Sequence, residues 1–352
     1  MKLTLAICVL VVFLLGCSTP GKPEPEEVVG TTPESVRFVM DEAKKGDPDA
    51  QFALSSLYYE GLGLKRDFEQ VNHWLLKAAE QDHAQAQFVL GNFYHDGIAV
   101  IQDVPRARNW YRKAAANGNI FAMLKLAGMQ AKGVGGEVNE EQSLKWCRTA
   151  AELGHSQAQA KLGSIYLNGE FNVPINEAEG FRMVQKSANQ GNPEGQHLLG
   201  ICYLRGMGVK QDFKKMEEWA TKAAEAGNIQ SQINLYVMLL KGENLRKDPV
   251  RALRFIEMAA RQGHADSQYN LGIYHYKGQG GSKDLAKAYF WFSVLSNHNE
   301  KAKKITEHIS VDLTPKEILE QMEKVAEYKQ QFELKKSSHT KKSKAQAALF
   351  GN

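Results

Sequence analysis

Apolar residues along this chain recur at the spacing of an α-helix. A small residue is followed four positions later by leucine, and usually by an aromatic residue four positions after that, as in Ala50, Leu54 and Tyr58. Residues spaced in this way lie on one face of a helix and predict a buried stripe along it. A glycine follows three residues after the aromatic position, where a left-handed backbone ends a helix at little cost. The pattern therefore predicts one amphipathic helix before each glycine.

A second helix is predicted to begin six or seven residues after each of these glycines. An Asp or Asn stands there every time, and such side chains accept hydrogen bonds from the free backbone N–H groups of a helix start. A large anchor such as Trp74 lies seven residues further on and is expected to fill the space between layers, while the small pair that follows lets backbones approach. The predicted N-caps are Asp67, Asp103, Asn139, Asn176, Asp212, Asp248 and Asp284.

This helix-turn-helix pattern repeats every 36 residues, with one added residue after Gly169. No single repeat can bury its apolar face alone, so neighbouring repeats must stack. The expected fold is all-α, a right-handed α/α superhelical solenoid of seven 36-residue repeats with N- and C-terminal capping helices. The turn glycines are Gly61, Gly97, Gly133, Gly169, Gly206, Gly242 and Gly278, and the repeats start near residues 49, 85, 121, 157, 194, 230 and 266.

Both ends of the predicted solenoid, residues 34–335, carry segments that suit a cap. Residues 34–46 match the second helix of a repeat without its first helix, with Phe38 in the anchor position. After the last repeat, Thr314 and Glu317 have the spacing of a capping box, and Pro315 suits the first helical position. We therefore expect a C-terminal capping helix within residues 314–335.

The N-terminus has an apolar run from Leu3 to Leu15 that is too short to cross a membrane as a helix. It ends in LLGC, which resembles the lipobox of bacterial lipoproteins, whose cysteine is acylated and becomes the mature N-terminus. The resemblance implies a signal peptide over residues 1–16, a membrane anchor at Cys17, and an outer-membrane location facing the periplasm, because Ser18 is not the aspartate that marks retention. Residues 17–33 are rich in Pro and Glu and are expected to be a flexible tether.

Charge is nearly balanced, with 44 basic and 40 acidic residues, so the composition does not indicate nucleic-acid binding. The segment KKSSHTKKSKAQAALFGN from Lys335 has lysines but no acid. We expect residues 336–352 to be a basic disordered tail, which either aids solubility or contacts anionic lipid or cell-wall polymer.

Catalytic and metal-binding patterns are missing from the sequence, so no catalysis, cofactor or metal is predicted. His83, His155 and His264 occupy a position that is asparagine in other repeats, which indicates a hydrogen bond in a turn. A glutamine that recurs as Gln51, Gln87 and Gln159 is interpreted in the same structural way. Cys147 and Cys202 are one whole repeat apart, and we expect them to be too distant for a disulfide.

The pattern AQFVLGNFYHDG…RARNWYRKAAANGN resembles the Sel1-like repeat, a relative of the tetratricopeptide repeat, and KAYFWFSVLS resembles its usual terminal unit. The resemblance implies an adaptor or scaffold that binds an envelope protein or peptide through the concave surface of the solenoid. It leaves two alternatives. One is a hydrolase directed at peptidoglycan or β-lactams, as described for cysteine-rich relatives, and the other is a surface-exposed virulence factor that contacts the host.

Partner-binding residues are expected at positions of the first helix that the buried stripe leaves free. The tenth position after the small residue is acidic near the predicted anchor and basic at the far end, which suggests a polarised groove; the alternative is that the cations simply suit a helix C-terminus. The candidates are Glu60, Asp96, Lys132, Asn168, Arg205, Lys241 and Lys277, with Asn92, Asn234 and Asn270 at the third and sixth positions.

Overall fold

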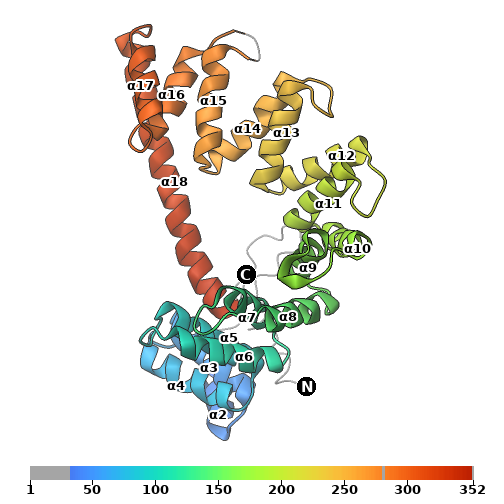
Figure 1. The fold of residues 1–352 in the computed structure, drawn as a ribbon. Coiled ribbons are helices and arrows are strands. Elements are labelled where there is room, and N and C mark those ends of the chain that lie inside the picture. The colour runs from blue at the N-terminus through green and yellow to red at the C-terminus, as the bar shows by residue number, and fades with distance from the viewer. Residues whose placement is uncertain (1–31, 280–281, 351–352) are drawn as a thin grey trace. The chain divides into compact units, whose positions relative to one another are not determined.

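The computed structural model describes residues 32–279 and 282–350. Within these ranges the chain forms seventeen α-helices, α2 to α18, and no strand (Figure 1). None of these helices is both long enough and apolar enough to span a bilayer. The predicted signal peptide, Cys17 and most of the predicted tether lie outside the described residues.

Seven helix-turn-helix repeats make up most of the fold, as the sequence predicted. The first helices of the repeats, called A helices, are α3 (Pro48–Glu60), α5 (Ala84–Asp96), α7 (Ile120–Lys132), α9 (Ser156–Asn168), α11 (Pro193–Arg205), α13 (Ile229–Lys241) and α15 (Ala265–Lys277). The second helices, called B helices, are α4 (Phe68–Glu80), α6 (Val104–Ala116), α8 (Glu140–Glu152), α10 (Glu177–Asn189), α12 (Phe213–Glu225), α14 (Pro249–Arg261) and α16 (Leu285–Leu295). The all-α solenoid fold is confirmed.

Local hydrogen bonds fix where the B helices begin. Each predicted Asp or Asn is the N-cap of its helix, and its side chain accepts from a backbone N–H of the first turn. Each turn glycine ends its A helix in the left-handed conformation, as Gly97 does with φ of 72°. After Gly169, a 3₁₀ turn over Glu170–Asn172 takes up the added residue.

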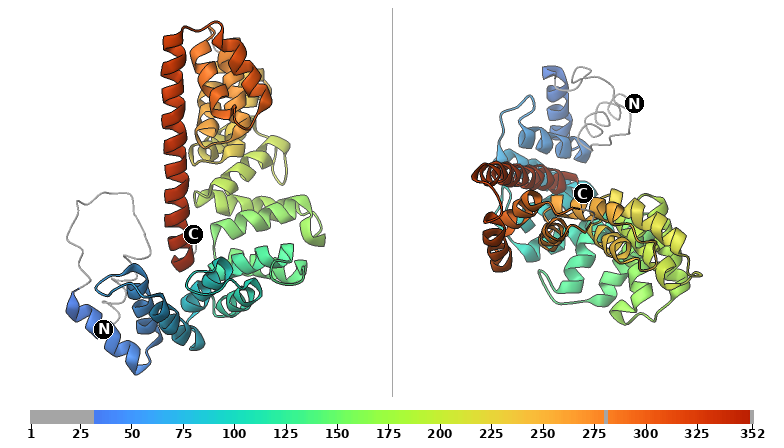
Figure 2. Two further views of the ribbon diagram at one scale, coloured as in Figure 1. Left: turned by 90° about the vertical axis from the view of Figure 1, so that its left-hand side faces the viewer. Right: turned by 90° about the horizontal axis from the view of Figure 1, so that it is seen from above.

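Two compact units divide the repeats. The N-terminal unit holds α2 (Pro33–Lys45) to α8, and the C-terminal unit begins at Gly154 and holds α9 to α17 (Glu300–Ser310) with α18 (Pro315–Phe350) up to His339. In the C-terminal unit, the first part of α18 lies beside the last repeat in both further views (Figure 2). The N-terminal cap was predicted correctly, since α2 is a B-type helix and is the first helix among the described residues.

Each repeat packs its small and branched residues into a continuous core. Leu54, Leu90 and Leu126 are at most 1% exposed, and the alanine pairs that end the B helices are buried with them. The predicted tryptophan anchors behave differently, because Trp74, Trp110 and Trp219 are only partly buried. A lysine three residues later lies over each ring, 4.2 to 4.9 Å from the centroid to Nζ. In these repeats the tryptophan therefore covers the outer rim of the core.

The C-terminal region contains one helix more than predicted and a longer cap. Helix α17 was not foreseen. At the start of α18, Thr314 and Glu317 form the predicted capping box, with Glu317 Oε2 accepting from Thr314 N at 2.8 Å. Helix α18 continues to Phe350, so the prediction that residues 336–352 form a disordered tail is wrong for residues 336–350. The segment between Pro315 and Gly351 has no Gly or Pro and is rich in Lys, Ala and Gln, so no residue in it breaks the helix.

Candidate functional site

The recurring glutamine of the A helices is structural. Gln87 Nε2 donates to the carbonyl of Ala79 at the end of the preceding B helix, at 3.0 Å. Gln87 Oε1 accepts from Asn117 Nδ2 at the end of its own B helix, at 2.9 Å. The same pair of bonds occurs at Gln51 and Gln232. These buried amides join three helices and are not available to a ligand.

The histidines that alternate with asparagine are N-caps of A helices. His83 Nδ1 accepts from Ala86 N at 3.0 Å, and its Nε2 lies 3.1 Å from Asp49 Oδ1. Its ring stacks on Phe52 with 5.0 Å between centroids. Burial lowers the pKa of His83, and this effect outweighs the negative charge of Asp49, which raises the pKa. His264 caps α15 through Nδ1 in the same manner, so the interpretation as turn hydrogen bonders is supported at His83 and His264. His155 stands at the N-cap of α9 but makes no side-chain cap hydrogen bond.

Groups suited to catalysis are sparse in the part of the chain that the structure describes. No cluster of His, Cys, Asp or Glu there has an arrangement that could hold a metal ion. Cys147 lies in α8 of the N-terminal unit and Cys202 in α11 of the C-terminal unit, and both are buried. Burial raises the pKa of Cys202 to about 12, so its thiol is protonated at neutral pH and is a poor nucleophile.

The tenth-position candidates are the last residues of the A helices. All of them are exposed except Glu60, which is half-buried. Asp96 Oδ1 contacts His95 Nδ1 at 2.6 Å, and Lys241 Nζ lies 3.7 Å from Glu243 Oε1. The N-terminal unit contributes Glu60, Asp96 and Lys132, and the C-terminal unit Asn168, Arg205, Lys241 and Lys277.

The third and sixth positions of the A helices are closed in the first two repeats of the N-terminal unit, whereas Lys125 and Gly128 at these positions of the third repeat are exposed. Val89 is fully buried and Asn92 is 4% exposed. Asn92 Oδ1 accepts a 2.7 Å hydrogen bond from the hydroxyl of Tyr111, which is itself fully buried. The prediction that Asn92 lies on an accessible binding surface is therefore wrong. Its amide is needed to satisfy a buried phenol.

The equivalent positions are open in the C-terminal unit. Their side chains are half-buried or exposed on α11, α13 and α15. Between α11 and α13, His197 Nδ1 lies 2.7 Å from Ser231 Oγ at the edge of a narrow slot that Ile201, Asn234 and Met238 line. We call these positions the open helix-A face: Leu198, Ile201, Asn234, Val237, Asn270 and Ile273.

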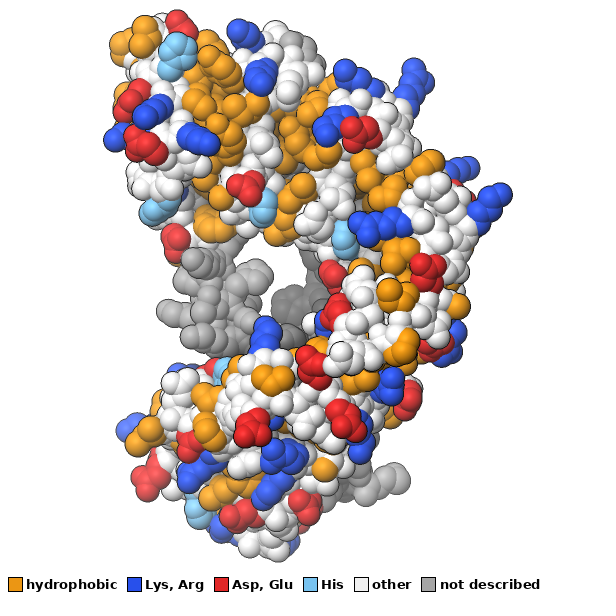
Figure 3. Space-filling model, in the orientation of Figure 1, with side chains coloured by type: hydrophobic (Ala, Val, Ile, Leu, Met, Phe, Trp, Pro, Cys, Tyr) orange, Lys and Arg blue, Asp and Glu red, His pale blue; other side chains and the backbone are white. Residues whose placement is uncertain are grey.

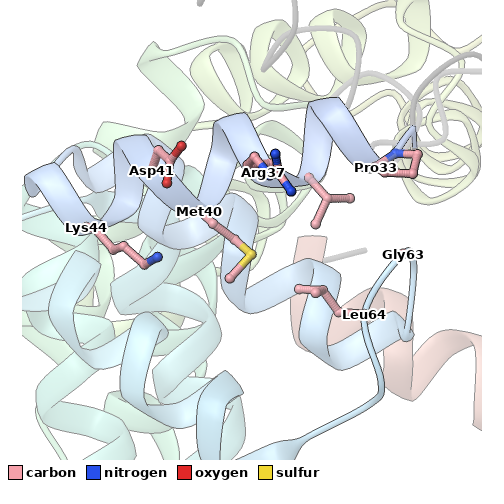
Figure 4. Close-up of a pocket in the computed structure, with 8 residues that line it drawn as sticks. Pro33, Arg37, Met40, Asp41, Lys44, Gly63 and Leu64 are labelled. Atoms are coloured by element: carbon pink, nitrogen blue, oxygen red, sulfur yellow. The ribbon is translucent and has the colours of Figure 1, made fainter.

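A hollow of about 420 Å³ lies on the N-terminal unit, between α2 and the turn after α3 (Figure 4). Arg37, Asp41 and Lys44 lie along one side of it, and Met40 and Leu64 give it an apolar wall. Its lining contains no Ser, Cys or His, so it has no pair of nucleophile and base.

A second hollow, of about 580 Å³, lies between α4 and α6 and was missed at the sequence level. Trp110 and Tyr94 line it together with Arg106, Arg112 and Lys113. The signal in the sequence was the composition of α6, VPRARNWYRKAAA, which has four cations and no acid. Lys113 already covers Trp110, and Arg106 covers Tyr94, so the aromatic faces are occupied.

Comparison with known proteins gives a consistent result. The family model described as the Sel1 repeat matches residues 48–83, 84–119, 120–155, 156–192, 193–228, 230–264 and 265–296. No curated protein matches the chain.

Solved structures resemble the chain with different sequence identities and TM-scores. A Sel1 repeat protein from Oxalobacter formigenes is 32% identical with a TM-score of 0.58, over 64% of this chain and 90% of that one. A protective antigen present in uropathogenic Escherichia coli strains, displaying an SLR fold, is 28% identical with a TM-score of 0.54, over 88% of this chain and 74% of that one. An immunity protein from Pseudomonas aeruginosa is 19% identical with a TM-score of 0.42, over 61% of this chain and 84% of that one.

Proposed function

Because this chain belongs to the Sel1 repeat family, we propose that it is a non-catalytic scaffold that binds a protein or peptide through the open helix-A face of its C-terminal unit. The observation that carries the proposal is the contrast between the repeats that carry this face and the first two repeats of the chain. Val89 and Asn92 are packed away in the N-terminal unit, whereas their counterparts Leu198 and Ile201 remain only half-buried. The C-terminal unit thus presents side chains that pack against its core but are only partly covered by it.

The composition of this face suits a polypeptide. Leu198, Ile201 and Val237 offer apolar area, and Asn234 and Asn270 offer amide donors and acceptors for a peptide backbone. Neighbouring repeats place equivalent residues side by side, so a ligand that runs along the stack meets the same chemistry several times. Interfaces of this mixed kind are typical of protein recognition.

We also propose that the scaffold acts at the bacterial envelope, anchored through an acylated Cys17 and exported to the periplasmic side of the outer membrane. The support is the sequence LLGC after an apolar run of signal-peptide length. A single acyl chain holds a protein weakly, whereas two or more hold it stably, so an anchor of this kind would keep the scaffold at the membrane.

Display at the cell surface is the second candidate location, and one observation favours it. The 28% identical relative is a protective antigen present in uropathogenic strains. Protease treatment of intact cells distinguishes the two locations, because only a surface-displayed chain would be cleaved. The hydrolase alternative has no such support, since Cys202 is buried and protonated at neutral pH.

Site-specific photocrosslinking in the native host tests the proposed function. A photoreactive residue replaces Val237 on the open face, and the control places it at Val311, which is 82% exposed in the turn after α17. The proposal predicts that the Val237 probe captures one defined envelope protein and the Val311 probe does not. Equal capture at both positions would contradict it. A Cys17→Ser variant that loses the capture would support the anchoring step separately.

A further inference from the structure

Exposed cations gather along one edge of the C-terminal unit, where the A helices of repeats five to seven turn into the B helices (Figure 3). We call this row the basic edge. All its members are exposed, and none forms an ion pair among the described residues: Arg205, Lys210, Lys214, Arg246, Lys247 and Lys277.

The carboxylates on the same edge have other partners. Asp212 Oδ1 accepts from the backbone N–H of Lys215 at 3.0 Å, and Asp248 and Asp284 cap their helices in the same way. Glu243 lies near Lys241. These acids are therefore directed at backbone donors or at cations outside the row, and the basic edge keeps an excess of positive charge.

The corresponding edge of the N-terminal unit has the opposite charge. Its carboxylates are Glu60, Glu69, Asp96, Glu137, Glu140 and Glu141, in the turns and first helical residues of repeats one to three, and we call them the acidic edge. Among the described residues, Asp96 alone of these has an ion-pair contact, with His95. Four cations stand beside these six carboxylates. Lys65, Arg66 and Lys132 are exposed and have no ion pair among the described residues, and Arg106 is engaged by Asp103 at 3.8 Å and by the ring of Tyr94.

Both edges lie along the turns between the A and B helices of consecutive repeats. Along each edge the charged residues therefore recur in each repeat. The A helices of repeats one and two end in the carboxylates Glu60 and Asp96, whereas those of repeats five to seven end in the cations Arg205, Lys241 and Lys277. We propose that the acidic edge of one copy binds the basic edge of a second copy, so that the chain self-associates through complementary edges. Individual surface ion pairs contribute little, but a row of them in register is additive and favours one partner.

The aromatic residues near the basic edge argue against single-stranded nucleic acid as its ligand. Lys215 Nζ lies 5.3 Å from the ring centroid of Tyr203, and Lys283 Nζ lies 5.9 Å from that of Tyr276. A lysine thus covers one face of each of these two rings, whereas base stacking needs open aromatic faces between the cations.

Reversal of charge on each edge gives a decisive test in the full chain carrying Cys17→Ser. One variant has Lys210→Glu, Arg246→Glu and Lys277→Glu, which cancels the net positive charge of the six residues that define the basic edge. The other has Glu60→Lys, Asp96→Lys and Glu137→Lys, which cancels the net negative charge of the six residues that define the acidic edge. A control carries Lys145→Glu, Lys186→Glu and Lys303→Glu on exposed helix surfaces away from both edges. Circular dichroism checks that each chain remains folded.

Sedimentation velocity over about 1 to 100 μM is the readout, at about 20 mM and about 500 mM salt. We expect the parent and the control to associate at low salt and to dissociate at high salt. Each edge variant alone is expected to be monomeric, and the equimolar mixture of the two to associate again. A monomeric parent under all conditions would overturn the proposal, as would a mixture that stays monomeric. Binding of the monomeric parent to phosphatidylglycerol vesicles or to poly-glutamate would assign the basic edge to another anion and would also overturn it.

Discussion

The hydroxyl of Tyr328 on α18 donates a 3.1 Å hydrogen bond to the carbonyl of Ala260 at the end of α14, 68 residues away in the chain. The same hydroxyl accepts from Gln268 Nε2 at 3.0 Å. In other repeats the partner of this glutamine is an amide at the end of the B helix, such as Asn117 or Gln262. The last B helix is shorter and ends at Leu295, and α18 supplies a polar partner to Gln268 at Nε2, whereas the amides of the other repeats donate to the glutamine Oε1.

Loss of the Tyr328 hydroxyl should weaken the attachment of the capping helix α18 to the last repeats. Tyr328→Phe keeps the ring against Trp291 and Phe332 but removes both hydrogen bonds, and we expect a loss of about 1 kcal/mol in the C-terminal unit. Hydrogen exchange of the amides in α15 and α18 measures it, with roughly fivefold faster exchange expected. Tyr276→Phe is the control, and similar acceleration in both variants would contradict the assigned role.

Substitution of a buried glutamine should lower the free energy of unfolding more than substitution of an exposed one. Gln87→Ala removes the partner of both Ala79 O and Asn117 Nδ2, and we expect a loss of about 1 to 3 kcal/mol because buried polar groups are left unpaired. Gln230→Ala, at an exposed position of α13, should change stability by less than about 0.5 kcal/mol. Urea denaturation compares the two, and equal effects would show that the buried amide is not structural.

Two helix glycines should respond to alanine with opposite signs. A Cβ on Gly91 would lie 2.7 Å from Cδ1 and Cε1 of the Tyr111 ring, so Gly91→Ala should destabilise the N-terminal unit by about 1 to 3 kcal/mol. A Cβ on Gly128 of α7 would meet nothing within 4 Å, so Gly128→Ala should stabilise by about 0.5 to 1 kcal/mol through helix propensity. Thermal unfolding of both variants tests the pair, and destabilisation by Gly128→Ala would refute the packing argument.

Acidic pH should weaken the fold through the histidine caps. Burial lowers the pKa of His83 in the folded chain, so the unfolded chain binds the proton more readily. The stability from neutral His83 is therefore present above about pH 6.5 and is lost as the pH falls through the lower folded value. Protonation also removes the lone pair on Nδ1 that caps α5.

Asparagine provides the matched variant, because Asn119 and Asn192 cap other A helices from the same position. We expect His83→Asn to lose less stability than the parent between pH 7.5 and pH 5, measured by urea midpoints at both pH values. His155, His197 and His275 also have lowered pKa values and remain in the variant, so part of the pH dependence should persist. An unchanged pH dependence would mean that His83 does not contribute.

Much of the fold was predictable because its signals are local. The turn glycines and the N-cap residues act within one helical turn of their own position, so the 36-residue period can be found without knowledge of any tertiary contact. The capping box at Thr314 is local in the same sense. The continuation of α18 beyond residue 335 was missed because a lysine-rich composition was interpreted as disorder, although nothing in it breaks a helix.

The candidate site could be predicted only in part. All seven tenth-position residues were correctly placed at the ends of A helices, since helical periodicity defines that position. Asn92 was misplaced because periodicity says which residues share a face but not what packs against it. In this case Tyr111 from the next helix covers Asn92, while the same positions on α11 and α13 stay open.

The sequence by itself thus determined the repeat, its helix boundaries and its caps, because these depend on backbone conformation and on partners a few residues away. Only the tertiary structure decided which side chains are buried and which remain available. It made Tyr328 a polar partner of Gln268, and it closed the A-helix face in the first two repeats but not in repeats five to seven. The physical reason is that burial and hydrogen bonding in a solenoid depend on neighbouring repeats, whose side chains meet across distances that local patterns do not encode.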